Sequence, residues 1–169
     1  MIKARYNKET EAFMLKVDHH GIGDFDSFSM KFDTGAVATV IGAGQLFEDY
    51  SEKNASDFRV LFEKAGIEPE DFESASGHEL IGYPCAFSNV LLSGVEIPFL
   101  PFYLVVNTSR NVSLLGNDFI SHCRFVHEPQ GDIEIVEYDR LAVKRSFLDK
   151  NKRAFDMNEL TKAYHRTDI

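Results

Sequence analysis

One short run of the chain combines a carboxylate with the residues that a tight, closely packed loop requires. Asp33-Thr34-Gly35-Ala36 follows the alternating apolar segment 28–32 and precedes a second apolar run that begins at Thr39. A carboxylate in such a loop can act as a general acid or base, and glycine lets the backbone approach it closely. The same residue types are also common in surface turns. The loop therefore indicates acid–base chemistry only together with support from elsewhere in the chain.

A second segment, residues 112–120, complements this loop. An apolar run is followed by Gly116, by the polar residues Asn117 and Asp118, and by a resumed apolar run. Alone, this pattern indicates a core strand that ends in a turn. Taken with residues 33–36, it resembles the retropepsin-like aspartic proteases, the single-domain family that includes the retroviral proteases. The resemblance covers about residues 12–137.

The resemblance assigns the chemistry to Asp33. In this family the Asp-Thr/Ser-Gly-Ala loop carries the catalytic aspartate, and the later glycine segment packs beneath it. Thr34 would join two such loops through hydrogen bonds from its hydroxyl to backbone, and Gly35 would present its backbone to the carboxylate and the substrate. Ala36 and Gly116 complete the supporting residues, and Ala36 offers no hydroxyl to the outer oxygen of Asp33.

A glycine-bearing segment between the two motifs, residues 73–80, resembles the flap of this family. Ser76, Gly77 and His78 would form its substrate-binding tip and close over an extended peptide, which would add strand-like hydrogen bonds. The resemblance thus predicts a polypeptide substrate, with no cofactor and no metal ion.

The single Asp-Thr-Gly run has a consequence for assembly. Two carboxylates about 3 Å apart share one proton, so that one takes a proton from a water while the other polarises the scissile carbonyl. The sequence holds one such run and no internal repeat. We therefore expect a homodimer, with a twofold axis between two copies of the loop around Asp33.

Three features depart from the retroviral pattern. Val37 and Asn117 stand where the retroviral enzymes pair an acid with an arginine. Because both partners are replaced, no unpaired buried charge remains. Residues 46–72 look like an insertion, and the segment 140–169 has no retroviral counterpart. The chain therefore fits a more distant, cellular branch of the family.

The elements that must position these residues are mainly strands. Alternating apolar residues around Leu15 and Met30 have the two-residue period of half-buried strands. Further short apolar runs are separated by glycine, proline and asparagine, which is typical of an all-β sandwich or barrel. The expected strands are 13–17, 28–32, 39–41, 90–92, 95–97, 102–106, 112–115, 124–127 and 133–136, the last two joined by a turn at 129–131.

Two segments have helical spacing instead, residues 54–65 and residues 156–166. In the second, Asp156 and Glu159 resemble a capping box. We therefore expect a mainly β fold, a retropepsin-like closed barrel over residues 1–139 with an inserted helix. A helical C-terminal extension, residues 140–169, follows it.

The composition is that of an ordinary globular chain with an acidic balance. There are 18 Lys and Arg residues against 27 Asp and Glu, a net charge of −9, which opposes non-specific binding to nucleic acid. No apolar run approaches the roughly 20 residues of a membrane helix, and residues 1–11 lack a signal-peptide core. Two cysteines without CxxC spacing favour a reducing compartment. We expect a cytoplasmic protein that binds neither nucleic acid nor a membrane.

The charge is unevenly distributed. Residues 140–169 carry eight basic and four acidic side chains, a net of +4, whereas residues 1–139 carry −13. Complementary fields can attract a basic tail to an acidic body or to a second copy. The simpler interpretation is a solvated helical tail.

His19 and His20 lie near Asp18, Asp24 and Asp26, and these residue types can serve as metal ligands. Adjacent histidines point to opposite faces of a strand, and the spacing matches no metal-binding motif. A polar loop is the favoured interpretation.

The sequence therefore predicts an aspartic endopeptidase that acts as a homodimer. The alternative is a non-catalytic dimeric interaction module that retains the acid-protease fold. Asp33 and Gly35 favour the enzyme, because a scaffold would not require a carboxylate at the axis.

Overall fold

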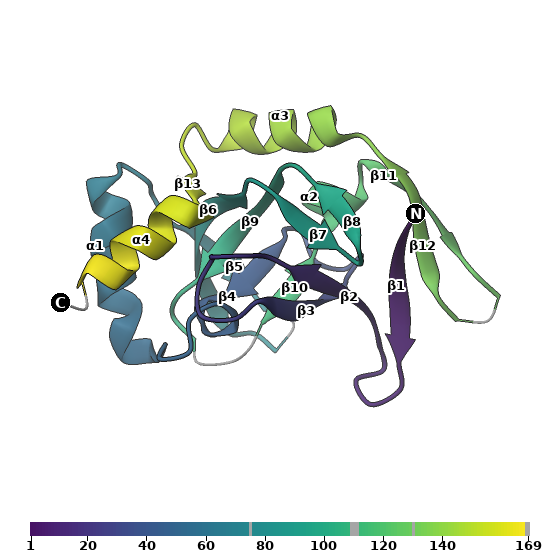
Figure 1. Cartoon of the computed structure of the whole chain (residues 1–169), viewed down its shortest axis with the longest axis horizontal. Coiled ribbons are helices and arrows are strands. Elements are labelled where there is room, and N and C mark those ends of the chain that lie inside the picture. Colours follow the sequence, from purple (N-terminus) through teal and green to yellow (C-terminus); the bar gives the residue numbers. More distant parts are fainter. Residues whose placement is uncertain (75, 109–111, 130, 168–169) are drawn as a thin grey trace.

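The computed structural model describes residues 1–74, 76–108, 112–129 and 131–167. These residues form a mainly β structure, in which a mixed sheet is flanked by a few helices (Figure 1). The strands are β1 (Ile2–Asn7), β2 (Ala12–Asp18), β3 (Ser27–Phe32), β4 (Val40–Gly42), β5 (Glu70–Glu73), β6 (Glu79–Phe87), β7 (Val90–Leu92), β8 (Val95–Ile97), β9 (Leu100–Val105), β10 (Ser113–Leu115), β11 (Cys123–His127), β12 (Ile133–Tyr138) and β13 (Phe155–Asp156). The α-helices are α1 (Ala55–Lys64), α2 (Asn117–Ile120), α3 (Arg140–Lys150) and α4 (Met157–Thr167), and short 3-10 helices are η1 (Ala43–Gln45) and η2 (Glu52–Asn54).

The strands pair in an open order. The main path runs β11-β12-β1-β2-β3-β10-β4-β9-β6-β13, while β5 pairs with β6, and β7 pairs with β2 and β8. No pairing among the described strands joins β11 to β13, and these two strands lie well apart in Figure 1. The hydrogen-bonded ladder is therefore an open mixed sheet and does not form the closed barrel expected from the sequence.

At the centre of the sheet, β10 lies between β3 and β4. It is parallel to β3, with Leu115 opposite Phe32, and antiparallel to β4. Parallel neighbours end at the same edge of a sheet. The residues that follow these two strands, Asp33 and Gly116, are therefore brought side by side although they are far apart in the sequence.

The strands with clear periodicity are present as expected. Leu15 of β2 lies opposite Met30 of β3, and both side chains are buried. β4 and β7–β12 cover the short apolar runs, and β11 pairs with β12 as a hairpin whose expected turn includes Gln130, outside the described residues. The length of β6 was not expected, because Gly82 and Pro84 usually interrupt strands.

The two helices with apolar periodicity lie next to each other at one end of the molecule (Figure 1). α1 covers most of the expected range 54–65, and α4 most of 156–166. Phe58 and Tyr164 stack with ring centroids 4.6 Å apart, and Phe47 packs against both. These rings belong to the main hydrophobic core, so the insertion and the extension close one end of it.

Asp156 caps the N-terminus of α4, as the capping pattern predicts. Its Oδ1 accepts from the backbone N–H groups of Asn158 at 2.9 Å and Glu159 at 3.3 Å. Immediately before the helix, β13 pairs in parallel with β6, with Phe155 opposite Cys85. This strand was not expected, because two residues carry no periodic pattern. None of the described helices combines the length and apolar character needed to cross a membrane.

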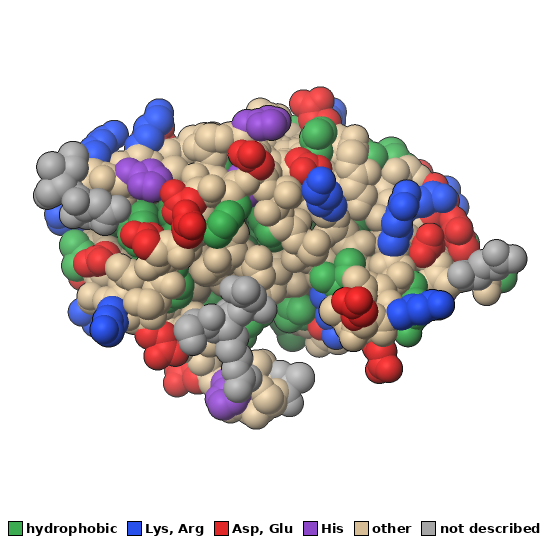
Figure 2. Space-filling view, turned by 60° about the horizontal axis from the view of Figure 1, so that its bottom comes forward, with side chains coloured by type: hydrophobic (Ala, Val, Ile, Leu, Met, Phe, Trp, Pro, Cys, Tyr) green, Lys and Arg blue, Asp and Glu red, His purple; other side chains and the backbone are tan. Residues whose placement is uncertain are grey.

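The extension is packed against the body and is not a solvated tail. Val143 and Met157 are 2% and 0% exposed, and both belong to the main core. Lys150 of α3 forms an ion pair with Glu70 of β5, with Nζ 2.7 Å from Oε1. On the face shown in Figure 2, described acidic and basic side chains are interspersed, so no continuous basic band crosses it.

Candidate active site

Asp33 follows β3 where the neighbouring β10 ends. Its backbone N–H donates to the carbonyl of Leu115 at 3.0 Å, and its own carbonyl accepts from the N–H of Ala36 at 3.2 Å. The first bond ties the start of the loop to the adjacent strand, and the second closes a turn. The loop position is therefore set by the sheet.

The Asp33 carboxylate is oriented by its own loop. The N–H of Gly35 donates to Oδ1 at 2.9 Å, and a Cβ on residue 35 would lie 3.2 Å from the same oxygen. Lys31 approaches the other oxygen, with Nζ 3.8 Å from Oδ2, but the lysine side chain is about half exposed and such a pair contributes little. The Asp33 side chain is 24% exposed, so the carboxylate is fixed in orientation and still accessible to solvent.

Gly116 allows the downstream segment to pack directly under the loop. A Cβ at this position would lie 2.5 Å from the backbone carbon and oxygen of Ala38 and 3.0 Å from the carbonyl oxygen of Ala36. Real Cβ atoms do not approach backbone this closely, so only glycine fits. The expected proximity of Gly116 to the loop is thus present, with a steric reason.

Asn117 binds the loop from the same side. Its backbone N–H donates to the carbonyl of Ala36 at 2.9 Å, and its side-chain Nδ2 donates to the carbonyl of Thr34 at 2.6 Å. Asn117 therefore holds the loop through both its backbone and its side-chain amide, and neither hydrogen bond needs an acidic partner.

Thr39 and Asp118 form a connection that the sequence did not reveal. The hydroxyl of Thr39 accepts from the N–H of Gly116 at 3.1 Å and donates to Asp118 Oδ1 at 2.6 Å, while the N–H of Thr39 donates to Oδ2 at 2.9 Å. Burial raises the pKa of the Asp118 carboxyl, although the hydrogen bonds from Thr39 act in the opposite direction. The available signal was an acidic residue inside an apolar run, and its partner lies far away in sequence.

The outer side of the loop is exposed. Thr34 and Gly35 are exposed, and the side chain of Val37 keeps 77% of its accessible surface. A single exposed apolar residue is common on protein surfaces and does not by itself indicate a partner. This side of the loop is free to meet another molecule.

The expected flap is the turn of a hairpin formed by β5 and β6. The N–H of Ser74 donates to the carbonyl of His78 at 2.8 Å, and the N–H of Gly77 donates to the carbonyl of Ser74 at 2.9 Å. Gly77 has φ +83°, a conformation that favours glycine. Ser76, Gly77 and His78 are exposed, and the tip residue Ala75 lies outside the described residues.

The base of this hairpin packs on the sheet that carries the Asp33 loop. Phe72 contacts Tyr103 of β9, with ring centroids 4.8 Å apart, and Tyr103 shares a second hydrophobic cluster with Ala38 and Val40. Among the described residues, no hydrogen bond or ion pair joins the hairpin tip to Asp33. The structure therefore connects the hairpin base, rather than its tip, with the surroundings of the loop.

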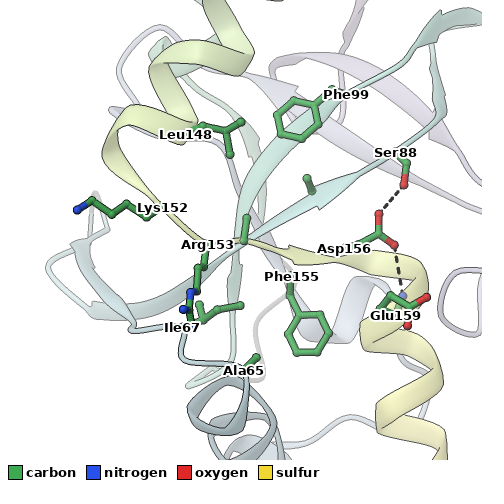
Figure 3. Close-up of a pocket in the computed structure, with 12 residues that line it drawn as sticks. Ala65, Ile67, Ser88, Phe99, Leu148, Lys152, Arg153, Phe155, Asp156 and Glu159 are labelled. Carbon is green, nitrogen blue, oxygen red and sulfur yellow. Dashed lines mark hydrogen bonds between the residues drawn. The ribbon is translucent and has the colours of Figure 1, made fainter.

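A cavity lies elsewhere, between the end of α1, β6 and the C-terminal extension (Figure 3). It has a volume of about 560 Å³, and Asp33 is not among the residues that line it. Phe99, Leu148 and Phe155 form much of its apolar wall. Asp156 borders it, hydrogen-bonded to Ser88 and to the start of α4 (Figure 3).

The described residues contain no group of three or more His, Cys, Asp and Glu side chains arranged to hold a metal ion. The segment around His19 and His20 lies within these described residues. His19 is 1% exposed, whereas His20 is exposed, so the two rings lie in different environments.

No protein-family model and no curated protein sequence matches this chain. Among solved structures, a crystal structure of a retropepsin-like aspartic protease from Rickettsia conorii is similar, with 14% sequence identity and a TM-score of 0.41. The similarity covers 78% of this chain and 87% of that one. What this chain does is therefore inferred from its own residues.

Proposed function

We propose that this chain is an aspartic endopeptidase of the retropepsin-like type, with an active site that two copies complete. The observation that carries the proposal is the Asp33 loop. Gly35 orients the carboxylate at 2.9 Å, the segment after β10 supports the loop from below, and the carboxylate remains accessible. A carboxylate held this way suits general acid–base work on a bound water.

The chemistry requires a second carboxylate. Two aspartates close together share one proton, so at a given moment one is ionised and the other protonated. The ionised group takes a proton from the water, whose oxygen attacks the peptide carbonyl carbon. The protonated group donates a hydrogen bond to the carbonyl oxygen, and a proton then passes to the leaving amine as the C–N bond breaks. In this scheme Asp33 and the same residue of a second copy exchange roles.

The other residues of the loop and the hairpin serve this reaction. The exposed hydroxyl of Thr34 joins the two loops, and Ala36 leaves the outer oxygen of Asp33 without a hydroxyl partner. Ser76, Gly77 and His78 at the hairpin tip contact an extended peptide substrate. The exposure of these three residues supports this role, since a peptide can bind an accessible hairpin through strand-like hydrogen bonds.

The surface around the loop supports association of two copies. Val37 is 77% exposed, and Phe125 and Val126 of the end strand β11 keep 40% and 48% of their surface. Phe125 packs edge-on against Phe32, the residue before Asp33, with ring centroids 5.3 Å apart. The exposed apolar side chains of β11, an end strand of the described sheet, favour pairing with another chain.

We assign residues 1–139 to the catalytic domain, with residues 46–72 as an insertion, and residues 140–169 to an extension that covers one end of the core. The cytoplasm is the compartment that the cysteines favour. Cys85 and Cys123 are free thiols, and Cys85 is buried.

The test compares the unmodified protein with Asp33→Asn on a peptide library at several values between about pH 4 and pH 7, because the acid and the base of the pair must both be present for cleavage. The amide oxygen of asparagine can still accept from Gly35, so the loop keeps its shape while the carboxylate is lost. Cleavage by the unmodified protein and none by the variant supports the proposal. Cleavage that survives the substitution contradicts it.

Sedimentation over a range of protein concentrations provides a second measurement. The enzyme requires a dimer in the conditions where it cleaves peptides. A dimer that is inactive in both forms would instead support a non-catalytic interaction module with the same fold.

A further inference from the structure

The cavity shown in Figure 3 has an apolar wall that is partly open to water. Its volume of about 560 Å³ lies in the range of ligand pockets. Phe99 and Phe155 are half-buried, and Leu148 of α3 is 38% exposed. Three alanines of the wall, Ala65, Ala86 and Ala154, have side chains too short to fill the space. The cavity can therefore receive an apolar group from another molecule.

Basic side chains surround one part of this cavity. Lys152 and Arg153 line it on one side (Figure 3), and Lys144 lies over the Phe99 ring with Nζ 5.4 Å from the ring centroid. Arg153 packs against Gly66, just beyond α1, where an added Cβ would meet its guanidinium. All three cations are exposed, and within the described residues none of them has an ion-pair partner. Their charges are therefore available to an acidic group.

The two acids of the cavity wall already have partners. Asp156 accepts hydrogen bonds from the Ser88 hydroxyl and from the first N–H groups of α4. Glu159 forms an ion pair with Lys162, with Oε1 3.6 Å from Nζ. Both acids lie on the side of the cavity away from the two lining cations (Figure 3). The charge that remains without a partner is therefore positive.

The segment beside the cavity is basic although the chain as a whole is acidic. Residues 140–153 carry six basic side chains and one acidic side chain, whereas the whole chain has a net charge of −9. Of the six, Lys150 forms an ion pair with Glu70. An acidic partner is repelled by most of the surface and attracted here, so the charge distribution favours this face for such a partner.

The cavity also runs along an edge of the sheet. Four consecutive residues, 153–156, line it, and two of them form β13. β13 pairs with β6 and is the last strand of the path through the described residues, so no described strand lies along its other edge. Backbone at a free strand edge can bind an extended peptide through main-chain hydrogen bonds.

We propose that this cavity is the docking site for an extended, acidic peptide segment of another protein. An apolar side chain of the segment enters the hollow beside Leu148, its carboxylates pair with Lys152 and Arg153, and its backbone lies along β13. A concave site suits a side chain, whereas a bilayer requires a convex apolar face, so a peptide fits better than an anionic membrane. Neither the loop 33–36 nor the hairpin tip lines the cavity, so the site is separate from the proposed catalytic one.

Fluorescence anisotropy with labelled peptides tests the site. The probe is a short peptide in which a central leucine is flanked by glutamates. One control peptide has glutamines in place of the glutamates, and a second has serine in place of the leucine. We expect the probe to bind, each control to bind at least tenfold more weakly, and added salt to weaken binding of the probe. Binding of either control as tight as that of the probe overturns the proposal.

Two pairs of variants locate the binding. Lys152→Glu reverses an exposed charge at the cavity, and Leu148→Asp places a carboxylate in its apolar wall. Each should weaken binding of the probe at least tenfold. Lys8→Glu makes the same charge change in the exposed turn between β1 and β2, and Leu141→Asp makes the same apolar-to-acid change on α3 outside the cavity. Both control variants should bind the probe as the unmodified protein does.

Three results would overturn the proposal: no binding of the probe by the unmodified protein, full binding after both Lys152→Glu and Leu148→Asp, or an equal loss of binding in Leu141→Asp and Leu148→Asp. If Leu148→Asp does not fold, Lys152→Glu decides. Sedimentation with vesicles of anionic phospholipid, without binding of the peptide, would identify a membrane as the partner and overturn the proposal as well.

The outcome does not depend on whether the chain cleaves peptides. Asp33→Asn should bind the probe as tightly as the unmodified protein, because Asp33 does not line the cavity. Loss of cleavage without loss of binding, or binding by a chain that never cleaves, therefore separates this site from the proposed catalytic function.

Discussion

Thr39 and Asp118 are joined at two points, with the threonine N–H 2.9 Å from one carboxylate oxygen and its hydroxyl 2.6 Å from the other. The same hydroxyl accepts from the N–H of Gly116 at 3.1 Å. Thr39 follows the proposed catalytic loop, and Gly116 and Asp118 belong to the segment beneath it. One buried side chain therefore connects the two sequence motifs.

Removal of this hydroxyl should destabilise the fold. Thr39→Val keeps the β-branched shape but leaves Asp118 and the N–H of Gly116 each without one partner. We expect the free energy of unfolding to fall by about 1–3 kcal/mol. Thr39→Ser should recover most of the loss, and Thr10→Val, at an exposed turn, should stay within about 0.5 kcal/mol of the unmodified protein. Urea unfolding measures all three, and an unchanged Thr39→Val would contradict the connection.

The two glycines of the site should respond differently to alanine. At Gly116 the added Cβ meets backbone at 2.5 Å, so Gly116→Ala should lower stability by about 1–3 kcal/mol or more. At Gly35 it meets only the Asp33 side chain at 3.2 Å. Gly35→Ala should therefore keep the melting temperature nearly unchanged and lower kcat, because the carboxylate must shift. Thermal melts beside peptide-cleavage kinetics separate the two effects. Equal loss of stability in both variants would contradict this interpretation.

The C-terminal helix should be required for stability. Tyr164 is 1% exposed and stacks on Phe58, with Phe47 packed on both rings. Tyr164→Ala should lower the free energy of unfolding by about 3–5 kcal/mol, the usual cost of removing a large buried ring. Tyr164→Phe keeps the ring and should cost about 1 kcal/mol or less, since the hydroxyl lies 3.4 Å from Asp49. Similar stability of both variants, measured by urea unfolding, would show that the helix is dispensable.

His19 should make the protein less stable in mild acid. Burial is the main cause of its lowered pKa, with His20 adding to the lowering, while Asp26, Asp18 and a hydrogen bond with the Ile22 backbone oppose it. The unfolded chain then binds a proton at a higher pH than the folded chain. The stability contributed by neutral His19 is therefore lost as the pH falls from about 6.5 to the lowered value, by at most about 1.4 kcal/mol per pH unit.

His19→Phe removes this titration, so its free energy of unfolding should decline less between about pH 7.5 and pH 5.5. The same substitution at the exposed His20 serves as the control and should retain most of the pH dependence. Unfolding curves at both pH values provide the measurement. If the free energy of unfolding of His19→Phe falls as steeply between these pH values as that of the unmodified protein, groups other than His19 dominate the pH dependence of stability.

The sequence by itself determined the elements with a clear period and the residues that need special backbone. Alternation around Leu15 and Met30 predicted β2 and β3, and helical spacing predicted α1 and α4, because a periodic apolar pattern reports which face of an element is buried. In the run 33–36, glycine beside a carboxylate suggested close backbone contact, whereas Gly116 was singled out by the resemblance to the retropepsin-like pattern.

Only the tertiary structure showed which strands, helices and side chains contact one another. Insertion of β10 between β3 and β4 and the bonding of Thr39 to Asp118 join residues far apart in the chain, and no local pattern names a distant partner. The burial of the C-terminal extension and the burial of His19 are of the same kind. Apolar periodicity and charge indicate which side chains of a segment tend to be buried or exposed. Which other segment those side chains contact depends on how the whole chain packs.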